Sequence, residues 1–397
     1  MLRVILTISA ALAVAGCTAN SANYAPQGDL AEAELPPLRF PETGQEALRP
    51  YYAGLDRDSL PVAGPNAALD ESKALTRIAF GSCYNENRPA DIWGQISKTD
   101  PDMFLMIGDN IYGDTGSNWA ANLPSVQRSY AKLAATPEFQ EFRANIPMMT
   151  SWDDHDYGAN DAGGAFAFKE YAERLYETFW DSPREVKARP GVYESRMVGP
   201  EGKKVQIILL DTRYFRSDLL RKPYRMERWA MGNYAEDSDP EATILGDAQW
   251  EWLAQELRKP ADLRLIFSSI QVITKAHDFE SWSNFPLEQE RLYSLLTAYN
   301  IDNAVLLSGD RHSGGLYRTQ LPGKDKPLWE LTSSSLNYSF RSGDTGDREP
   351  DEHRVGGFFS DENFGQIDID WDGKKVKLTL TRSDGETLIS QDVPALQ

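Results

Sequence analysis

The chain has 397 residues, and 41% of them are hydrophobic, which is enough for one large domain or two of ordinary size. With 41 basic and 60 acidic residues the formal net charge is −19, and no stretch supplies the basic surface that phosphate backbones require. We therefore expect no nucleic-acid partner, whereas clusters of acidic residues can serve as cation sites.

The amino terminus has the pattern of a secretory signal. A positively charged start is followed by an apolar run over residues 4–14, which is too short to span a bilayer stably. The run ends in Val14-Ala-Gly-Cys17, which resembles a bacterial lipobox; an ordinary cleaved signal with a chance cysteine is the alternative. We expect residues 1–17 to be a lipoprotein signal peptide, lipidated at Cys17. The protein would then be exported and anchored to a bacterial cell membrane, and Thr18 favours the periplasmic side of the outer membrane.

Residues 18–72 are rich in Ala, Pro, Gly, Asn and acidic residues without sustained periodicity, which predicts a flexible tether and lead-in. We expect the folded domain to occupy residues 73–397. Only two cysteines are present, so lipidation of Cys17 would leave Cys83 without a disulfide partner. Cys83 is then either a buried core residue or a ligand.

Apolar strands alternate with amphipathic helices through most of the folded part. Strands are expected at 75–80, 103–107, 147–151, 205–210, 263–273 (one long strand or a pair) and 303–308. Helices are expected at 91–97, 130–144, 166–180 and 288–298, with a further helix introduced by residues 245–249; within 130–144, Pro137 marks a break or the start of a new helix. Two alternating runs within 364–389, on either side of Asp372-Gly373, predict a hairpin. Together these elements predict a mixed α/β domain with two sheets rather than one doubly wound sheet.

The strand expected at 103–107 ends in Gly108-Asp109, with Tyr112 three residues later. This strand is apolar throughout, which is typical of a parallel sheet covered on both faces. Ligands bind outside the carboxyl ends of strands in such sheets. Asp109 and Tyr112 are therefore candidate site residues.

Five expected strand ends carry residues of the same kinds. They are Cys83; Asp109 with Tyr112; Asp153, Asp154, His155 and Asp156; Asp211; and Asp310 with His312. Any one of the acidic residues could simply cap a helix or a turn. Taken together, carboxylates crowded this closely would repel one another unless a cation neutralises them.

The candidate ligands differ in chemical hardness. Cys thiolate, Tyr phenolate and His suit a transition metal, ferric iron in particular, whereas sets of Asp suit calcium, magnesium or manganese. We therefore predict a mixed bimetal site with a bridging carboxylate. Two ions about 4 Å apart activate water and hold the attacking and leaving oxygens of a displacement at phosphorus. In a metal-free alternative, His155 and His312 would act as a pair of bases, but no nucleophile elbow is visible.

Five motifs, in this order and spacing, resemble those of the alkaline phosphatase D family. They are Gly81-Ser-Cys83, Gly108-Asp-Asn-Ile-Tyr112, Trp152-Asp-Asp-His-Asp-Tyr-Gly-Ala-Asn-Asp161, Leu210-Asp-Thr-Arg213 and Gly309-Asp-Arg-His312. Pro137-Glu-Phe-Gln also matches, and the resemblance covers residues 76–390. It implies a calcineurin-like metallophosphatase related to the purple acid phosphatases, with a four-layer α/β/β/α sandwich of two mixed β-sheets. It also implies hydrolysis of phosphate monoesters and diesters with ferric iron and calcium.

The resemblance implies a role for each motif residue. Iron would be bound by Cys83, Tyr112 and His312, with Asp109 as the bridging carboxylate. Asp310 would bind on the calcium side, and Asp154 occupies the position where related phosphatases have a metal-binding Asn. His155 would stand near the leaving group as general acid or charge stabiliser. Residues with supporting or calcium-binding roles would be Asn110, Asp153, Asp156 and Asn160.

Two further residues belong to the expected site, and at one position the chain differs from the related phosphatases. Arg213 would contact the substrate phosphate or form a structural salt bridge, and Asp211 would support the site. Related phosphatases carry a His at the end of the strand found here at 265–271. In its place the chain offers Ser268, Ser269, Gln271 or, further on, His277, and the last ligand of the hard-metal site stays open among these four. We otherwise expect His277 and His353 to face solvent.

We therefore predict an exported metallophosphoesterase (alkaline phosphatase or phosphodiesterase) in which a metal-bound hydroxide attacks small phosphate monoesters or diesters. The acidic net charge favours small or singly charged esters over polyanions. One alternative is a phospholipase. Apolar residues in the insertion at 215–243 would favour it, but this stretch is mostly polar, and its apolar members include Leu219, Leu220, Met226, Trp229 and Met231. Another is a catalytically inactive ligand-binding lipoprotein, which would predict loss of ligand types that are in fact present.

Overall fold

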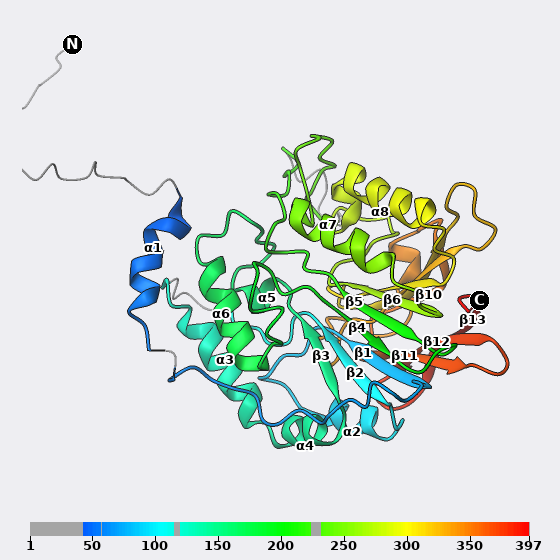
Figure 1. The fold of residues 1–397 in the computed structure, drawn as a ribbon, viewed down its shortest axis with the longest axis horizontal. Coiled ribbons are helices and arrows are strands. Elements are labelled where there is room, and N and C mark those ends of the chain that lie inside the picture. The colour runs from blue at the N-terminus through cyan, green and yellow to red at the C-terminus, as the bar shows by residue number, and fades with distance from the viewer. Residues whose placement is uncertain (1–42, 57, 115–119, 224–231, 397) are drawn as a thin grey trace, which may run out of the picture. The chain divides into compact units, whose positions relative to one another are not determined.

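Two β-sheets of mixed direction form the centre of the protein (Figure 1). The computed structural model describes residues 43–56, 58–114, 120–223 and 232–396, which belong to one unit, Glu42–Gln397. The predictions made for Cys17, Met226, Trp229 and Met231 lie outside the described residues. Among the described helices, none is both long and apolar enough to cross a membrane.

The first sheet has the order β13-β12-β11-β1-β2-β3, and the second has the order β10-β8-β9-β7-β6-β5-β4. The strands of the first sheet are β1 (Arg77–Gly81), β2 (Met103–Ile107), β3 (Met148–Ser151), β11 (Asn363–Asp370), β12 (Lys375–Arg382) and β13 (Thr387–Val393). Those of the second are β4 (Glu194–Val198), β5 (Val205–Leu209), β6 (Leu263–Ser268), β7 (Ala304–Ser308), β8 (Gly314–Thr319), β9 (Leu328–Thr332) and β10 (Arg354–Phe359). Strands β1, β2 and β3 are parallel, as are β5, β6, β7 and β9.

Helices cover the outer faces of both sheets (Figure 1). They are α1 (Gly44–Ala53), α2 (Asp91–Ser97), α3 (Pro124–Ala135), α4 (Pro137–Asn145), α5 (Asp154–Tyr157), α6 (Lys169–Trp180), α7 (Gly246–Leu257) and α8 (Pro286–Ala298). Two short 3₁₀ helices are η1 (Trp282–Asn284) and η2 (Gly346–Arg348). Figure 1 shows α7 and α8 on one side of the sheets and α3, α4 and α6 on the other.

The described residues form three apolar cores, and side chains at successive positions of a strand point alternately into two of them. In β1, Ile78 and Phe80 join the core between the two sheets, whereas Ala79 joins the core under the helices of the first sheet. In β7, Leu307 enters the inner core and Leu306 packs under α7 and α8. This alternation follows from the period of two along a strand, and it produces the α/β/β/α layering.

Most elements expected from the sequence are confirmed, and two needed correction. The segment 263–273 is neither one long strand nor a pair, because β6 ends at Ser268 and a turn follows. The expected helix 130–144 is two helices that begin at Pro124 and at Pro137, so only the break was placed correctly. The hairpin predicted around Asp372-Gly373 is confirmed, because β11 and β12 pair antiparallel on either side of it, and β13 adds a third strand beside β12.

Part of the expected lead-in is ordered structure. Helix α1 lies within 18–72, and its Tyr52 ring stacks on Tyr171 of α6 with the centroids 4.9 Å apart. Tyr52 is only 2% exposed. The composition of this segment did not indicate a helix that packs against the domain.

Candidate metal centre

Parallel strands of both sheets end at one edge, and the candidate ligands lie in the loops that follow. Cys83 follows β1, Asp109 follows β2, and Asp310 and His312 follow β7. The segment after β3 supplies Asp153 and then the short helix α5, which begins with Asp154 and His155. The fold thus brings together residues that lie more than 200 positions apart in the chain.

Four of these residues hold backbone conformations that side chains disfavour. The φ angle is 57° at Cys83, 50° at Asp109, 64° at Asp310 and 48° at His312. Such strain costs of order 1–3 kcal/mol per residue and persists only where the surrounding structure enforces it. At Gly108, φ is 115° and a Cβ atom would lie 2.6 Å from that of Asp153, so glycine allows this close approach.

Three overlapping groups of potential metal ligands form at this edge, and within each the ligand atoms lie within 4.8 Å of one another. They are Cys83, Asp109 and His312; Asp109, Asp154 and His155; and Asp109, Asp153, Asp154 and Asp310. Asp109 belongs to all three groups and is fully buried. A shared carboxylate is what a bridging ligand requires.

Cys83, Tyr112 and His312 surround one oxygen of Asp109. The Cys83 sulfur and the Tyr112 hydroxyl each lie 3.3 Å from Oδ2 of Asp109, and that hydroxyl lies 3.4 Å from Nε2 of His312. The carbonyl oxygen of Tyr338 lies 2.6 Å from Nδ1 of His312, which fixes the ring. Burial lowers the pKa of His312 to about 4, so its imidazole is neutral, as in metal-binding histidines.

The carboxylates on the other side are poorly compensated. We call Asp109, Asp153, Asp154 and Asp310 the carboxylate centre. Burial and the charge of neighbouring carboxylates raise the pKa of Asp109 and Asp310 well above the usual range. Oδ2 of Asp153 and Oδ1 of Asp154 are buried without a hydrogen-bond partner among the described residues. These donors fit hard cations, which would neutralise their charge and complete their contacts.

His155 lies at the edge of this centre and is held by a carboxylate that the sequence did not single out. Its Nδ1 lies 2.5 Å from Oδ1 of Asp114. Burial opposes a charge on His155, but Asp154, Asp109 and Asp114 outweigh it and raise the pKa of His155 to about 11. In the metal-free protein these carboxylates therefore favour the protonated imidazole, which can donate a proton through Nε2.

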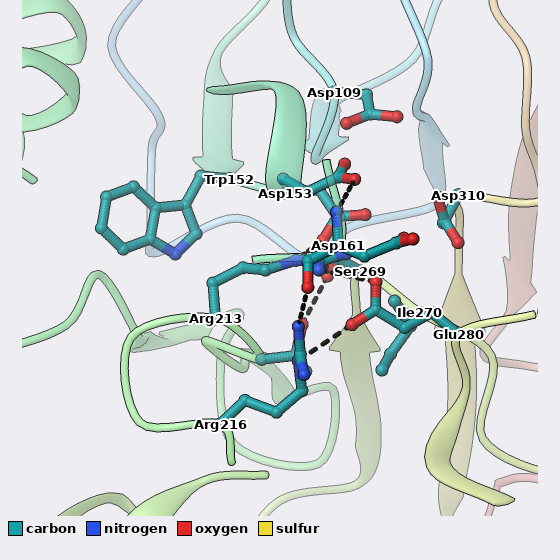
Figure 2. Close-up of polar contacts among 12 residues, drawn as sticks. Asp109, Trp152, Asp153, Asp161, Arg213, Arg216, Ser269, Ile270, Glu280 and Asp310 are labelled. Carbon is teal, nitrogen blue, oxygen red and sulfur yellow. Dashed lines mark hydrogen bonds and ion pairs between the residues drawn. The ribbon is translucent and has the colours of Figure 1, made fainter. Parts of the chain in front are cut away.

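Arg213 lies behind the centre, in contact with other charges. Figure 2 shows Arg213 between Asp153 and Glu280, and Arg216 beside Glu280. Arg213 Nη1 lies 2.6 Å from Glu280, and Arg216 Nε lies 2.9 Å from it. We call Arg213, Arg216 and Glu280 the arginine network. Because both Arg side chains are fully buried, this geometry favours the structural salt bridge for Arg213 over contact with substrate.

Three further acidic or amide residues fix the loops around the centre. Asp156 accepts hydrogen bonds from the backbone N–H groups of Asn110 and Asp153 at 3.0 and 3.1 Å. The side chain of Asn110 donates to the carbonyl oxygen of Ser151 at 2.9 Å. Asp211 accepts from Trp152 Nε1 at 2.9 Å and from the backbone N–H of Arg213 at 2.8 Å. Asp156, Asn110 and Asp211 therefore hold the loops that carry the candidate ligands.

The four candidates for the last hard-metal ligand have other contacts. Ser268 donates to the carbonyl oxygen of Ile270, and Ser269 donates to Asp153, both at 2.6 Å. Gln271 donates to Thr332 at 2.9 Å and lies 3.0 Å from Nε2 of His277. His277 is only 5% exposed, so the expectation that it faces solvent was wrong.

Sequence reasoning missed two acidic residues beside the centre. Asp161 and Glu280 form a fourth group with Asp154, again with ligand atoms within 4.8 Å. Asp161 is the last residue of the motif that begins at Trp152. Glu280 lies in an irregular segment between β6 and α8 that shows no hydrophobic periodicity. Asn160, by contrast, is exposed at the pocket wall.

A cavity of about 560 Å³ opens over the centre. Its walls include Tyr112, Asp154, His155, Asp310 and His312. Substrate-sized molecules can therefore reach the candidate ligands from solvent, with His155 beside them.

Comparisons with known proteins agree on one family. The profile described as PhoD-like phosphatase matches residues 78–380. Alkaline phosphatase D of Bacillus subtilis (strain 168) is 23% identical over 275 residues, which are 59% of this chain and 46% of that protein. The chain thus spans about half the length of this curated relative. The solved structure of PhoD is similar with a TM-score of 0.63 and 18% identity, covering 84% of this chain and 74% of that one. This last similarity supports the two-sheet fold.

Proposed function

Because the chain belongs to the PhoD-like phosphatase family, we propose that it is a metal-dependent hydrolase of phosphoric esters. The observation that carries the proposal is the position of Asp109, a buried carboxylate that three groups of potential ligands share; other members of these groups, Asp154, Asp310 and His312, line an open cavity. Phosphate ester hydrolysis needs positive charge where the phosphate oxygens lie, and this centre has a surplus of buried carboxylates to hold cations there.

The donor chemistry supports two metals of different kinds. Cys83, Tyr112 and His312 would hold ferric iron with Asp109, because thiolate, phenolate and imidazole suit it. Asp153, Asp154 and Asp310 would hold calcium with the same Asp109, because hard cations prefer carboxylate oxygens. When bound, such ions lower the pKa of water and neutralise charge that develops on the phosphate.

The chain's own residues supply proton transfer. His155 is protonated because three carboxylates face it, and Asp114 holds its Nδ1. His155 Nε2 can therefore give its proton to the leaving oxygen as the bond between phosphorus and that oxygen breaks. Tyr338 holds His312 by its carbonyl oxygen, and this contact keeps the neutral ring of His312 in place.

Export and lipid anchoring form a separate part of the proposal, supported by the sequence of residues 1–17. A Cys17→Ser variant expressed in a bacterial host should lose labelling by radioactive palmitate and should leave the membrane fraction. Equal labelling of the variant and of the unchanged protein would contradict the anchor.

The enzymatic proposal is tested with protein that starts after Cys17. Hydrolysis of p-nitrophenyl phosphate and of bis(p-nitrophenyl) phosphate is measured with calcium present and again after chelation. Turnover of either ester that chelation abolishes supports the proposal, and the preferred ester gives the substrate class. Absence of turnover in protein shown to contain metal contradicts it, and a parallel assay on phosphatidylcholine then tests the phospholipase alternative.

A further inference from the structure

The outer wall of the cavity carries two exposed aromatic rings. Phe340 is 65% exposed and Phe279 is 39% exposed, and both line the cavity. Six large hydrophobic residues are this exposed among the described residues, so two of the six lie at one opening. Exposed aromatic rings gathered at a cavity indicate a binding surface.

Phe340 stands directly beside the candidate ligands. Its ring centroid lies 4.4 Å from that of His312 and 5.0 Å from that of Tyr338, and Tyr338 in turn lies 4.4 Å from Tyr112. This row of rings runs from the buried centre to solvent. An organic group attached to a phosphate at the centre would therefore meet the free face of Phe340.

Arginine side chains accompany these rings. Arg311 lies under Phe279, 4.8 Å from its centroid, and is paired with Glu349 at 2.5 Å. Arg341 and Arg348 also line the cavity and are exposed, and neither forms an ion pair with any described residue. In a chain with a net charge of −19, two uncompensated guanidinium groups at one opening create a local site for anions.

From these observations we infer the substrate class, an inference that rests on the proposed phosphoesterase function. The group esterified to the phosphate contains a flat aromatic ring, which stacks on Phe340, and a second negative charge, which Arg341 and Arg348 bind. Nucleotides with more than one phosphate group are examples of this class. The inference differs from the preference for singly charged esters that net charge alone predicts, because the exposed guanidinium groups of Arg341 and Arg348 lie beside Phe340 at the opening, whereas the acidic residues of the lining lie nearer the centre or are paired, as Glu349 is with Arg311.

The aromatic part is tested by ligand binding without turnover. Benzylphosphonate and cyclohexylmethylphosphonate have a similar size and charge, but only the first is flat and aromatic. Calorimetric titration into the metal-loaded protein should show about five-fold tighter binding of benzylphosphonate. The Phe340→Ala variant should bind the two equally. Tyr51→Ala, which removes an exposed ring away from the cavity, should keep the preference. Equal binding of both by the unchanged protein, or no binding of either, overturns the inference.

The anionic part is tested with 4-carboxybenzylphosphonate, which adds one negative charge. The unchanged protein should bind it about three-fold more tightly than benzylphosphonate at low salt, and less so at 0.5 M salt. Exchanging both Arg341 and Arg348 for Gln should remove this advantage, whereas Arg128→Gln, an exposed arginine on α3, should not. An advantage that survives in the double variant overturns this part.

Failure of this inference and failure of the proposed function are distinguishable. Ester turnover without any ring or charge preference removes only the inference. A ring and charge preference in protein that turns over neither nitrophenyl ester removes the proposed function and leaves the ligand class standing.

Discussion

Two groups of buried charge meet at Asp153, and they are organised in opposite ways (Figure 2). In the arginine network, Arg213 and Arg216 share Glu280, and each charge faces an opposite one. In the carboxylate centre, His155 and Arg213 stabilise the charge of Asp154, whereas the pKa values of Asp109 and Asp310 stay well above the usual value. The first group is compensated by the protein itself, whereas the second is compensated only in part.

The pKa shifts express this difference. Burial and the charges of Asp153 and Glu280 have opposite effects on Arg213, and the carboxylates prevail, so its pKa is raised well above the usual value. Burial and like charges together raise the pKa of Asp310. Since a fold does not bury several uncompensated carboxylates without a reason, the centre is built to be completed by cations. The network behind it keeps Asp153 in place.

The largest effect is expected at the shared carboxylate. Asp109→Asn should lower kcat/KM on the preferred nitrophenyl ester by about a thousand-fold, because it removes a ligand common to three groups. Metal content measured by mass spectrometry should fall in parallel. Asp372→Asn, whose side chain is 96% exposed, is the matched control and should change neither. Turnover and metal content that survive in Asp109→Asn would contradict the bridging role.

The arginine network is expected to matter for stability. Arg213→Met should lower the free energy of unfolding by about 3–5 kcal/mol, because it leaves two buried carboxylates without their partner. Urea denaturation measures this change. Arg49→Met breaks an exposed pair with Glu170 and should leave the free energy of unfolding nearly unchanged. Similar losses in both variants would show that the network is not the compensated unit described above.

A substitution of Asp114 tests how far this carboxylate stabilises the positive charge of His155. Asp114→Asn should lower kcat about ten-fold, because it removes the carboxylate that orients His155 and stabilises its protonated form. Since that carboxylate raises the pKa of His155, its loss should move the alkaline limb of the pH–rate profile to lower pH. A fall in kcat without movement of that limb would mean that Asp114 has only a structural role.

The smallest effects are expected in the metal-free protein. There, a substitution in the carboxylate centre and one in the arginine network should change the free energy of unfolding in opposite directions. Asp310→Asn removes repulsion among the carboxylates and should raise the stability of the metal-free protein at pH 8, although the same change weakens the metal-loaded form. Arg213→Met should lower the stability of both forms. A loss of stability in metal-free Asp310→Asn would contradict the claim that this carboxylate is uncompensated.

The pH dependence follows from the same shifts. Burial raises the pKa of Asp156 to about 7, so the protonated form is favoured in the folded state. Its stabilising contribution is complete below the unfolded value near 4 and is lost as the pH rises through about 7. The raised pKa values of Asp109 and Asp310 act in the same direction. Metal-free protein should therefore melt at a lower temperature at pH 8 than at pH 5. An opposite slope would contradict these shifts.

Much of the carboxylate centre could be predicted from the sequence, because its residues follow apolar strands directly. Cys83, Asp109 and Asp310 each come two residues after the end of a strand, and parallel strands bring such ends together. The same logic identified β1, β2 and β7. The sequence pattern did not predict the left-handed backbone conformation of Cys83, Asp109 and Asp310, because only the packing of the folded structure enforces that conformation.

The arginine network could not be predicted, because its members lie in segments without periodicity. Glu280 comes from an irregular stretch before η1, and Arg216 from the polar insertion at 215–243. Their partners are set by long-range packing and not by local sequence. Strand β8 was missed for a similar reason, since its two initial glycines pack against Leu380 and Phe358 and leave no apolar pattern.

The most direct test of the account is the melting temperature of the metal-free protein at pH 8 during titration with iron and calcium. The account predicts a rise of several degrees that saturates, since ligand at 100 times its dissociation constant adds about 2.7 kcal/mol. The rise should be absent in Asp109→Asn and retained in Asp372→Asn. A metal-free protein that is as stable as the loaded one would contradict the claim that cations complete the carboxylate centre.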